Sequence, residues 1–440
     1  ATCALASGTV MSWNIVGGSL PKRNITFPST VNTVNTNITI ESYFVYSWLL
    51  RLNHIGASVG IMSAVFIAQI IGRKHSISIL CFLFLLSWIL KLVGDMDNLI
   101  TAMILGGICI GSASAVVPMY LCELAVDKFR GSTGSLYFAM FTLGRLITEA
   151  TTKASYIWYT SIPLFFPPLF FITVFLAPES PPYLIYKEKT TEAKISLLRL
   201  RDGDVSAEFI GMAEEIQPSI KRFAIKDIVV KTSTRKGVLF SFTTMMFLAL
   251  CGASQIQSLI SDFYGFHNYY ILNLINLSIQ IVFSVAAGRL SDIIGRKKLL
   301  IFSALTMSSS LIVFGIYYRL GNRIKYWILP KVFIFVFIIG YSSGFGPLSW
   351  IIVMELIPIN VKYVGCILTI SSYWLVELLF HDVFVDNMEE CVGKDVFMWI
   401  VAGICVLAAT FVFFLLPETI KLNIKERRES LHKKKAATTE

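Results

Sequence analysis

Hydrophobic residues in this chain fall into runs of about 20, and this feature limits its possible folds more than any other. A helix of roughly 20 residues spans about 30 Å of hydrocarbon. Because lipid offers no hydrogen-bond partners, such a run must pair its own backbone polar groups, as a helix does. Only 15% of the 440 residues are charged, whereas an average soluble chain has roughly 25%. The sequence therefore predicts an all-α integral membrane protein.

The apolar runs are arranged in two groups on either side of a polar stretch. They cover about 1–20, 43–71, 76–94, 99–122, 133–150, 156–177, 237–260, 269–290, 299–318, 327–354, 361–380 and 396–416. We therefore expect twelve transmembrane helices in four parts: a six-helix half at 1–177, an intracellular helical linker at 178–236, a second six-helix half at 237–420 and a basic tail at 421–440. The chain begins at Ala1 inside an apolar run and without a methionine, so we expect a truncated first helix.

The basic residues predict the orientation of the chain. They gather after the second and eighth runs, at 73–75 and 296–298, and in the tail, and cytoplasmic loops carry such an excess of Lys and Arg. We expect both termini to be cytoplasmic and the protein to lie in the plasma membrane. The expected exterior loop at 21–42 contains two sequons for N-glycosylation, at Asn24 and Asn37.

Several functional classes are not supported by the sequence. The formal net charge of +10 comes mainly from short loops and the tail, so we expect no nucleic-acid partner. Most of the eight cysteines lie inside apolar runs, where they act as buried apolar side chains. No zinc-ligand spacing, nucleophile–base pair or nucleotide loop is visible. We therefore expect no enzyme activity, no metal and no cofactor.

Short charged motifs recur in the same order in both halves. Gly72-Arg73-Lys74 returns as Gly295-Arg296-Lys297, and Pro178-Glu179 returns as Pro417-Glu418. Glu123 and Arg130 are seven residues apart, as are Glu355 and Lys362. Matching halves indicate a duplicated transporter with a site near the midplane between them.

These charges lie at the inner ends of helices, where they predict a gate. Ion pairs that form only while the inner side is closed would favour the outward-open state, and breaking them would be the cost of opening inward. The alternative is that they merely anchor the helix ends at the lipid headgroups. The predicted gate residues are Arg73, Glu123, Arg130, Glu179, Arg296, Glu355, Lys362 and Glu418.

Together these motifs resemble the sugar porter family of the major facilitator superfamily, in particular insect facilitated trehalose and hexose transporters. The motifs are Gly72-Arg73-Lys74, Pro118 to Glu123, Arg130-Gly131, Pro178 to Pro181, Gly295-Arg296-Lys297, Gly344 to Trp350 and Pro417-Glu418-Thr419. The resemblance covers nearly the whole chain and implies the major facilitator fold, alternating access and a central sugar site. It also adds Asp292 to the gate, whereas the matching position of the first half carries Gln69. Lys362 stands where the family has an arginine.

The resemblance implies a sugar site that is much altered in this chain. Sugars are held by amides and hydroxyls, with an aromatic ring beneath them. The family's fifth-span amide is replaced by Phe138, and its seventh-span asparagine is replaced by Ser254. Gln255 could substitute for the lost amides by facing differently. The residues retained from the family are Gln280, Trp350 and Trp374.

Charged residues also occur inside the predicted spans. Arg145 follows Phe138 by seven positions and so shares its helix face, and Glu377 lies one turn beyond Trp374. Intramembrane charges are costly and therefore mark functional sites. Three explanations remain open: a structural pair of Arg145 with Glu149 or Glu377, an anionic or zwitterionic substrate, and proton coupling.

The sequence leaves three functions open. The first is a facilitative transporter of a sugar (trehalose, a hexose or a polyol); Asn14, which follows Trp13, favours it because proton-linked relatives carry a carboxylate there. The second is a transporter of a charged small solute. The third is a transport-weak receptor that binds an exterior protein partner through the 21–42 or 383–395 loops.

Overall fold

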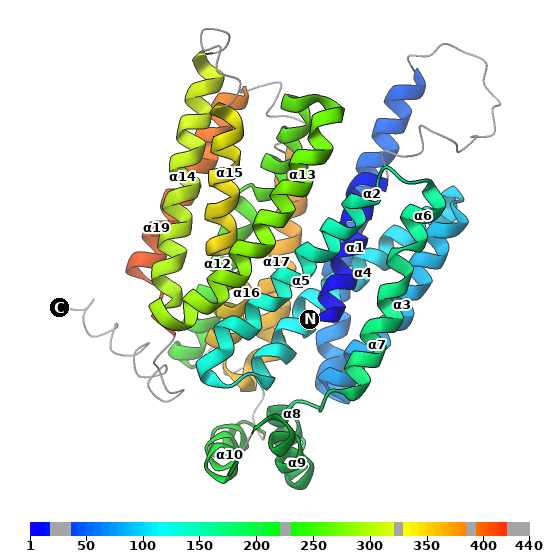
Figure 1. Ribbon diagram of the computed structural model, residues 1–440. Helices are drawn as coiled ribbons and strands as arrows, with labels where there is room; N and C mark the ends of the chain where they lie inside the picture. The colour runs from blue at the N-terminus through cyan, green and yellow to red at the C-terminus, as the bar shows by residue number, and fades with distance from the viewer. Residues whose placement is uncertain (18–36, 202, 221–229, 321–328, 384–392, 420–440) are drawn as a thin grey trace.

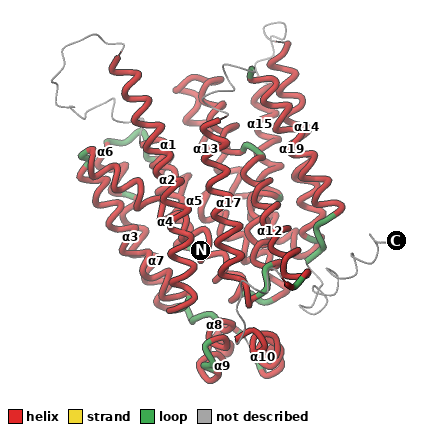
Figure 2. Tube along the Cα trace, turned by 180° about the vertical axis from the view of Figure 1, so that it is seen from behind, coloured by secondary structure: helices red, strands yellow, loops and turns green. Residues whose placement is uncertain are grey.

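The chain is a bundle of long helices, from one end of which three short helices project (Figure 1). The computed structural model describes residues 1–17, 37–201, 203–220, 230–320, 329–383 and 393–419, and these contain helices but no strand. The short helices are those of the predicted linker, so we call this end of the bundle the linker face. Figure 2 shows the same arrangement from behind.

The first half contains six crossing segments. The sixth is divided by Pro163 and Pro167, because proline lacks the N–H that continues a helix. The elements are α1 (Thr2–Gly17), α2 (Asn37–Ile71), α3 (Arg73–Val93), α4 (Met96–Leu124), η2 (Asp127–Phe129), α5 (Arg130–Ala150), α6 (Tyr156–Ser161), η3 (Pro163–Phe165) and α7 (Phe166–Leu176).

The second half repeats this plan. Its fourth crossing segment is divided at Gly344. The backbone N–H of Phe345, the next residue, donates to the Ser303 hydroxyl oxygen at 3.1 Å. The elements are α12 (Thr232–Leu250), α13 (Ala253–Ile294), α14 (Arg296–Leu320), α15 (Leu329–Ser343), α16 (Phe345–Leu356), η5 (Ile359–Val361), α17 (Lys362–Val383) and α19 (Lys394–Phe414).

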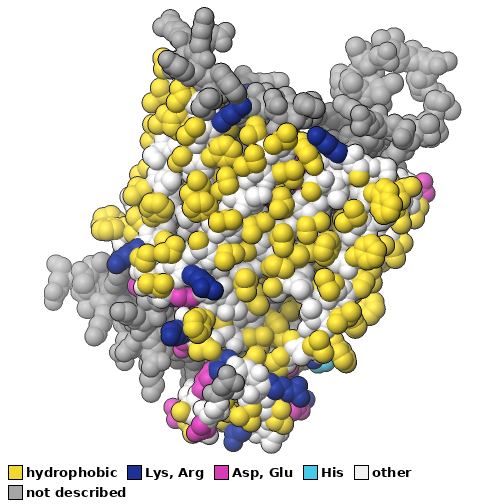
Figure 3. Space-filling view, viewed as in Figure 1, with side chains coloured by type: hydrophobic (Ala, Val, Ile, Leu, Met, Phe, Trp, Pro, Cys, Tyr) yellow, Lys and Arg dark blue, Asp and Glu magenta, His cyan; other side chains and the backbone are white. Residues whose placement is uncertain are grey.

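The predicted twelve-segment transmembrane architecture is confirmed. Within the described ranges, nine helical segments are long and apolar enough to cross a membrane. The other expected crossings are α1, which has 16 residues, and α5 and α12, which contain charged residues. Apolar side chains cover most of the face seen in Figure 3, while charged ones gather at and just above the linker helices.

Three expected boundaries were wrong. α2 begins at Asn37, so the end of the expected 21–42 loop is helical. The expected connection at 261–268 lies inside α13, and α12 begins at Thr232, inside the expected linker. The expected boundaries were taken from the ends of apolar runs, which mark where the hydrocarbon of the membrane ends. A helix can extend beyond that point, because its end is defined by its own backbone hydrogen bonds. Asn24 and the tail from 421 lie outside the described residues.

The linker helices have a small apolar core of their own and contact both halves. They are α8 (Pro181–Tyr186), α9 (Thr190–Leu200) and α10 (Ser206–Ile220). Arg201 pairs with Glu208 at 2.9 Å and donates to the backbone oxygen of Leu124 in α4 at 3.1 Å. Ile359 of the second half packs against the core, which consists of Tyr183, Leu184, Ile185, Ala193 and Ile216.

Candidate transport site and linker-face gate

In the first half, the predicted gate residues form a buried cluster at the linker face. The Arg73 guanidinium donates to Glu123 through Nε at 3.0 Å and through Nη2 at 3.3 Å. The Ser180 hydroxyl donates to the same carboxylate at 2.5 Å. Because both charges are buried, removing either one would leave its partner unpaired in a poorly solvated place.

The second half repeats this pair with an additional acid. Arg296 Nη2 lies 3.2 Å from Glu355 and 3.3 Å from Asp292. All three side chains are buried. The repeat seen in the sequence is therefore a repeat of ion pairs in space.

In the contacts described, Glu179 and Glu418 accept backbone N–H groups instead of pairing with the side chains of the predicted gate cations. Glu179 accepts the backbone N–H groups of Arg73 and Lys74, at 3.0 and 3.2 Å. Glu418 accepts the N–H of Arg296 in the same way, at 3.0 Å. Each carboxylate thus satisfies free N–H groups at a helix N-terminus, where the helix dipole favours negative charge.

Two contacts join the halves at the linker face. Lys362 of the second half lies 3.4 Å from Glu123 of the first. Asp292 accepts the N–H groups of Gly131 and Ser132, both at 2.8 Å, and the Ser132 hydroxyl at 2.7 Å. The Asp292 contacts hold the N-terminus of α5 against α13, and the Lys362–Glu123 contact joins α17 to α4.

The remaining predicted gate residue, Arg130, forms an ion pair with Asp127 one turn away. Asp127 belongs to the short helix that precedes α5, so this pair lies within the first half. Arg130 therefore contributes no contact between the halves through this pair, and its role in gating stays a prediction.

Between the halves, aromatic side chains form a continuous row that we call the aromatic bridge: Tyr137, Trp350, Tyr373 and Trp374. Consecutive ring centres lie 5.3, 5.4 and 5.3 Å apart in edge-to-face contacts. Trp374 also donates from Nε1 to the Ser114 hydroxyl at 3.2 Å. Because Tyr137 and Ser114 belong to the first half, the two retained tryptophans connect the halves.

Several buried polar atoms near the middle of the second half have no hydrogen-bond partner among the described residues. They are Asn276 Oδ1, Gln280 Nε2, Ser342 Oγ and Ser371 Oγ. Gln280 and Asn276 are both 1% exposed and lie one turn apart on α13. An unpaired buried polar group costs about 1–3 kcal/mol, so each needs an explanation, and a polar ligand or a water molecule provides one.

Sequence reasoning selected Gln280 and missed Asn276. A signal was present, because the buried polar residues Asn273, Asn276, Gln280 and Ser284 recur at helical spacing along one otherwise apolar segment. Such a stripe marks a face turned away from lipid. α13 packs against α5 and α15, whose residues Phe138 and Tyr341 are in edge-to-face contact at 5.8 Å.

The intramembrane charges lie within polar networks. Glu377 accepts a hydrogen bond from Ser254, which joins α17 to the first turn of α13. Glu149 accepts the Ser12 hydroxyl at 3.4 Å, interacts with Asn273 of the second half, and is influenced by the charge of Arg145. Glu149 thus connects α5 to α1 and α13. The side chain of Gln255 lies outside the described residues.

Comparisons with known proteins agree with this geometry. The family model described as "Sugar (and other) transporter" matches residues 1–431. A facilitated trehalose transporter of Bombyx mori is 26% identical, and the match covers 93% of this chain and 84% of the relative. A solved proton:xylose symporter of the major facilitator superfamily, bound to 6-bromo-6-deoxy-D-glucose, has a TM-score of 0.83 with 19% identity and covers 98% and 97% of the two chains.

An inward-open structure of the xylose transporter of E. coli has a TM-score of only 0.68, with 19% identity and coverage of 97% and 98%. The expected resemblance to sugar porters is confirmed, and the chain belongs to the sugar (and other) transporter family.

Proposed function

We propose that this transporter carries a small sugar (trehalose, a hexose or a polyol) across the plasma membrane by facilitated diffusion. The observation that carries the proposal is the buried amide of Gln280, whose Nε2 has no partner among the described residues. A sugar hydroxyl is an acceptor of the kind this donor lacks. The similarity to a facilitated trehalose transporter supports the same substrate class.

The arrangement suggests how binding is coupled to alternating access. A sugar between the halves would accept from Gln280 and donate to Asn276 Oδ1, while the aromatic bridge offers a ring for its apolar face. Opening toward the linker face would then break the Glu123–Lys362 pair and release the N-terminus of α5 from Asp292. We propose that this face and both termini are cytoplasmic.

Facilitated diffusion, rather than proton symport, is favoured by one position in α1. Asn14 follows Trp13, where proton-linked relatives carry a carboxylate. We therefore expect uptake to be unaffected by a protonophore. A loss of concentrative uptake in its presence would instead indicate proton coupling.

The test is uptake of labelled trehalose and glucose by oocytes that express the chain, with surface expression measured in parallel. We expect saturable uptake that falls sharply in Trp350→Ala. Trp158→Ala is a matched control, because the Trp158 side chain is exposed on the outside of the bundle. Unchanged uptake in Trp350→Ala would contradict the placement of the sugar, and no uptake of any sugar by well-expressed protein would contradict the function.

A charged small solute is a second candidate, favoured by the burial of Glu377 and by the proximity of Arg145 to Glu149. For an anionic substrate, Arg145→Gln should abolish uptake, whereas sugar uptake should be reduced less than in Trp350→Ala. The receptor alternative depends on the 21–42 and 383–395 loops, most of which lie outside the described residues, so an exterior partner stays a prediction.

A further inference from the structure

A groove of about 640 Å³ lies at the linker face, where α2 and α3 meet the linker helices. It is separate from the aromatic bridge and from the unpaired polar atoms of α13. One wall is apolar and is formed by Ile70, Ile79 and Phe82. The rim toward the linker is basic: Lys187 and Lys189 belong to the linker, and His75 lies on α3, one turn before Ile79.

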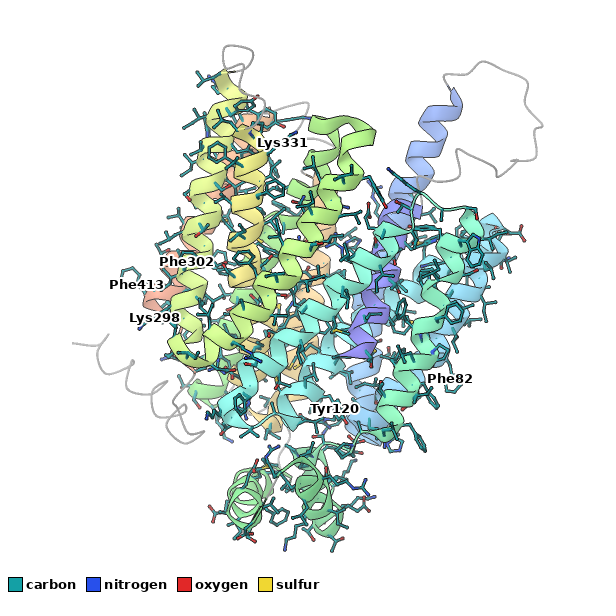
Figure 4. The ribbon with its side chains drawn as sticks, in the orientation of Figure 1. Phe82, Tyr120, Lys298, Phe302, Lys331 and Phe413 are labelled. Atoms are coloured by element: carbon teal, nitrogen blue, oxygen red, sulfur yellow. The ribbon has the colours of Figure 1, made fainter. Side chains whose placement is uncertain are left out.

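The apolar wall is exposed although it lies within membrane-crossing helices. Ile70, Ile79 and Phe82 are 53%, 42% and 64% exposed. Ile79 and Phe82 lie in the second and third turns of α3, which begins at the linker face with Arg73, and Figure 4 shows Phe82 at the outer edge of the bundle. These side chains therefore border the hydrocarbon of the leaflet next to the linker.

The basic rim lies just beyond that hydrocarbon. Lys187 and Lys189 are exposed on the connection between α8 and α9. Lys189 lies 3.0 Å from Glu192, and His75 lies 3.4 Å from Glu179, so each of the two already has an acidic partner of its own. Glu179 is already engaged by backbone N–H groups, and Lys187 lies over the Tyr183 ring at 5.9 Å. Lys187 is thus the cation best placed for an anion in the groove.

We propose that this groove binds an acidic phospholipid of the adjacent leaflet. The lipid phosphate would lie at Lys187 with support from Lys189 and His75, and an acyl chain would lie along Ile70, Ile79 and Phe82. A soluble phosphate compound would leave the apolar wall in contact with lipid alone, whereas a phospholipid complements both walls at once. Basic residues close to a membrane surface attract acidic headgroups in this way.

The groove is continuous with the gate of the first half. Its floor is Tyr183, whose hydroxyl donates to the backbone oxygen of Ile70 at 2.8 Å and whose ring lies 4.9 Å from the Arg73 guanidinium. Arg73 in turn pairs with Glu123. A bound lipid would therefore hold α8 against α2 and stabilise the closed linker face.

The test uses the full chain in nanodiscs of phosphatidylcholine that contain a photoactivatable phosphatidylserine, with a diazirine in its acyl chain. Mass spectrometry then maps the labelled peptides. We expect labelling enriched in the segments 70–82 and 181–189. Lys187→Gln and Lys189→Gln should each lower it by up to roughly fivefold, the effect of about 1 kcal/mol per basic residue near a surface.

The repeat supplies a matched control. Lys298 of α14 is the counterpart of His75, and Phe302 is the counterpart of Ile79; both lie across the bundle from Phe82 (Figure 4). Lys298→Gln should leave labelling of the groove unchanged. Both lysines of the groove are exposed, so their variants should fold, which a thermal unfolding curve checks.

Three results would overturn the proposal. Equal labelling by a phosphatidylcholine probe would show that charge plays no part. Unchanged labelling in the doubly substituted protein would remove the lysines from the site. Displacement of the probe by excess soluble glycerophosphoserine would assign the site to a soluble phosphate ester instead. Because the assay measures no transport, its failure would leave the proposed sugar uptake untouched.

Discussion

Asp292 in α13 accepts the backbone N–H of Gly131 at 2.8 Å and thereby holds the N-terminus of α5, which belongs to the other half. A carboxylate at a helix N-terminus gains both a charge-assisted hydrogen bond and a favourable interaction with the helix dipole. The matching position of the first half is Gln69, which has no charge. We call this contact of Asp292 with the N-terminus of α5 the latch; the first half has no acid at the position that would repeat it.

Removing this charge should favour the inward-open state. Asp292→Asn weakens three hydrogen bonds and leaves Arg296 with one acid fewer. A hydrogen bond to a charged group contributes about 1.5–3 kcal/mol, so the ratio of open to closed protein should rise by roughly ten- to a hundredfold. Electron–electron distance measurements between spin labels on Lys128→Cys and Lys298→Cys, two exposed positions on opposite halves, should show a longer population.

The converse change gives the control for this prediction. Gln69→Asp adds the missing acid at the position equivalent to Asp292, so it should shorten the mean distance between the same labels. If the two substitutions shift the distances in the same direction, the latch does not control the equilibrium.

Gly72 should tolerate no side chain. Its φ of +104° is rarely adopted by other residues, and an added Cβ would lie 2.3 Å from Glu179 Oε2. Gly72→Ala therefore strains the backbone, at a cost of about 1–3 kcal/mol, and also displaces the carboxylate that satisfies the first N–H groups of α3. We expect a lower thermal unfolding temperature.

Gly203 separates these two effects. It has a φ of +111°, yet an added Cβ would meet no atom within 4 Å. Gly203→Ala should thus reveal the backbone strain alone and lower the unfolding temperature less than Gly72→Ala. Equal losses in the two variants would show that displacement of Glu179 contributes nothing to stability.

Gln280→Leu should separate stability from transport. The Gln280 amide nitrogen has no partner among the described residues, and replacing such a group by an apolar one of similar size is close to neutral or stabilising. We expect an unfolding temperature equal to or above that of the unmodified protein, together with a large loss of sugar uptake and of stabilisation by added sugar.

Asn273→Leu is the matched variant two stripe positions away on α13. Asn273 interacts with Glu149, so its loss leaves a buried carboxylate with one partner fewer and should lower the unfolding temperature. A destabilised Gln280→Leu would mean that this amide has a structural role, and its assignment to the sugar site would be withdrawn.

The sequence predicted the ion pairs at the linker face better than the contacts in the middle of the bundle, because a duplicated chain shows its paired charges twice. Arg73 and Glu123, and Arg296 and Glu355, were selected by their repeat and are paired in space. The capping role of Glu179 was not predictable, since a sequence does not show which N–H groups a carboxylate faces.

The interior of the bundle contains features that spacing alone could not reveal. Lys91 lies in an apolar segment of α3, one turn after Trp88, whose ring lies 4.6 Å from its ammonium. Only the tertiary fold brings the Trp13 ring of α1 to 4.5 Å from the same ammonium. The aromatic bridge likewise includes Tyr137 and Tyr373, which no motif singled out. Contacts between distant helices depend on rotation about each helix axis, and the apolar runs in this chain define that rotation only weakly.

Lys362→Arg tests whether the contact of Lys362 with Glu123 limits the transport rate. Lys362 lies 3.4 Å from Glu123. A guanidinium can donate two parallel hydrogen bonds to a carboxylate and binds it more rigidly than an ammonium does. The substitution should strengthen the contact between the halves and increase the closed population seen with the spin labels at 128 and 298. Sugar uptake should fall several-fold if release at the linker face limits the rate.

Lys362→Met should have the opposite effect on the distances between the spin labels, because it removes the charge that pairs with Glu123. A shift of both variants toward the open state would show that the lysine is already the better partner for Glu123.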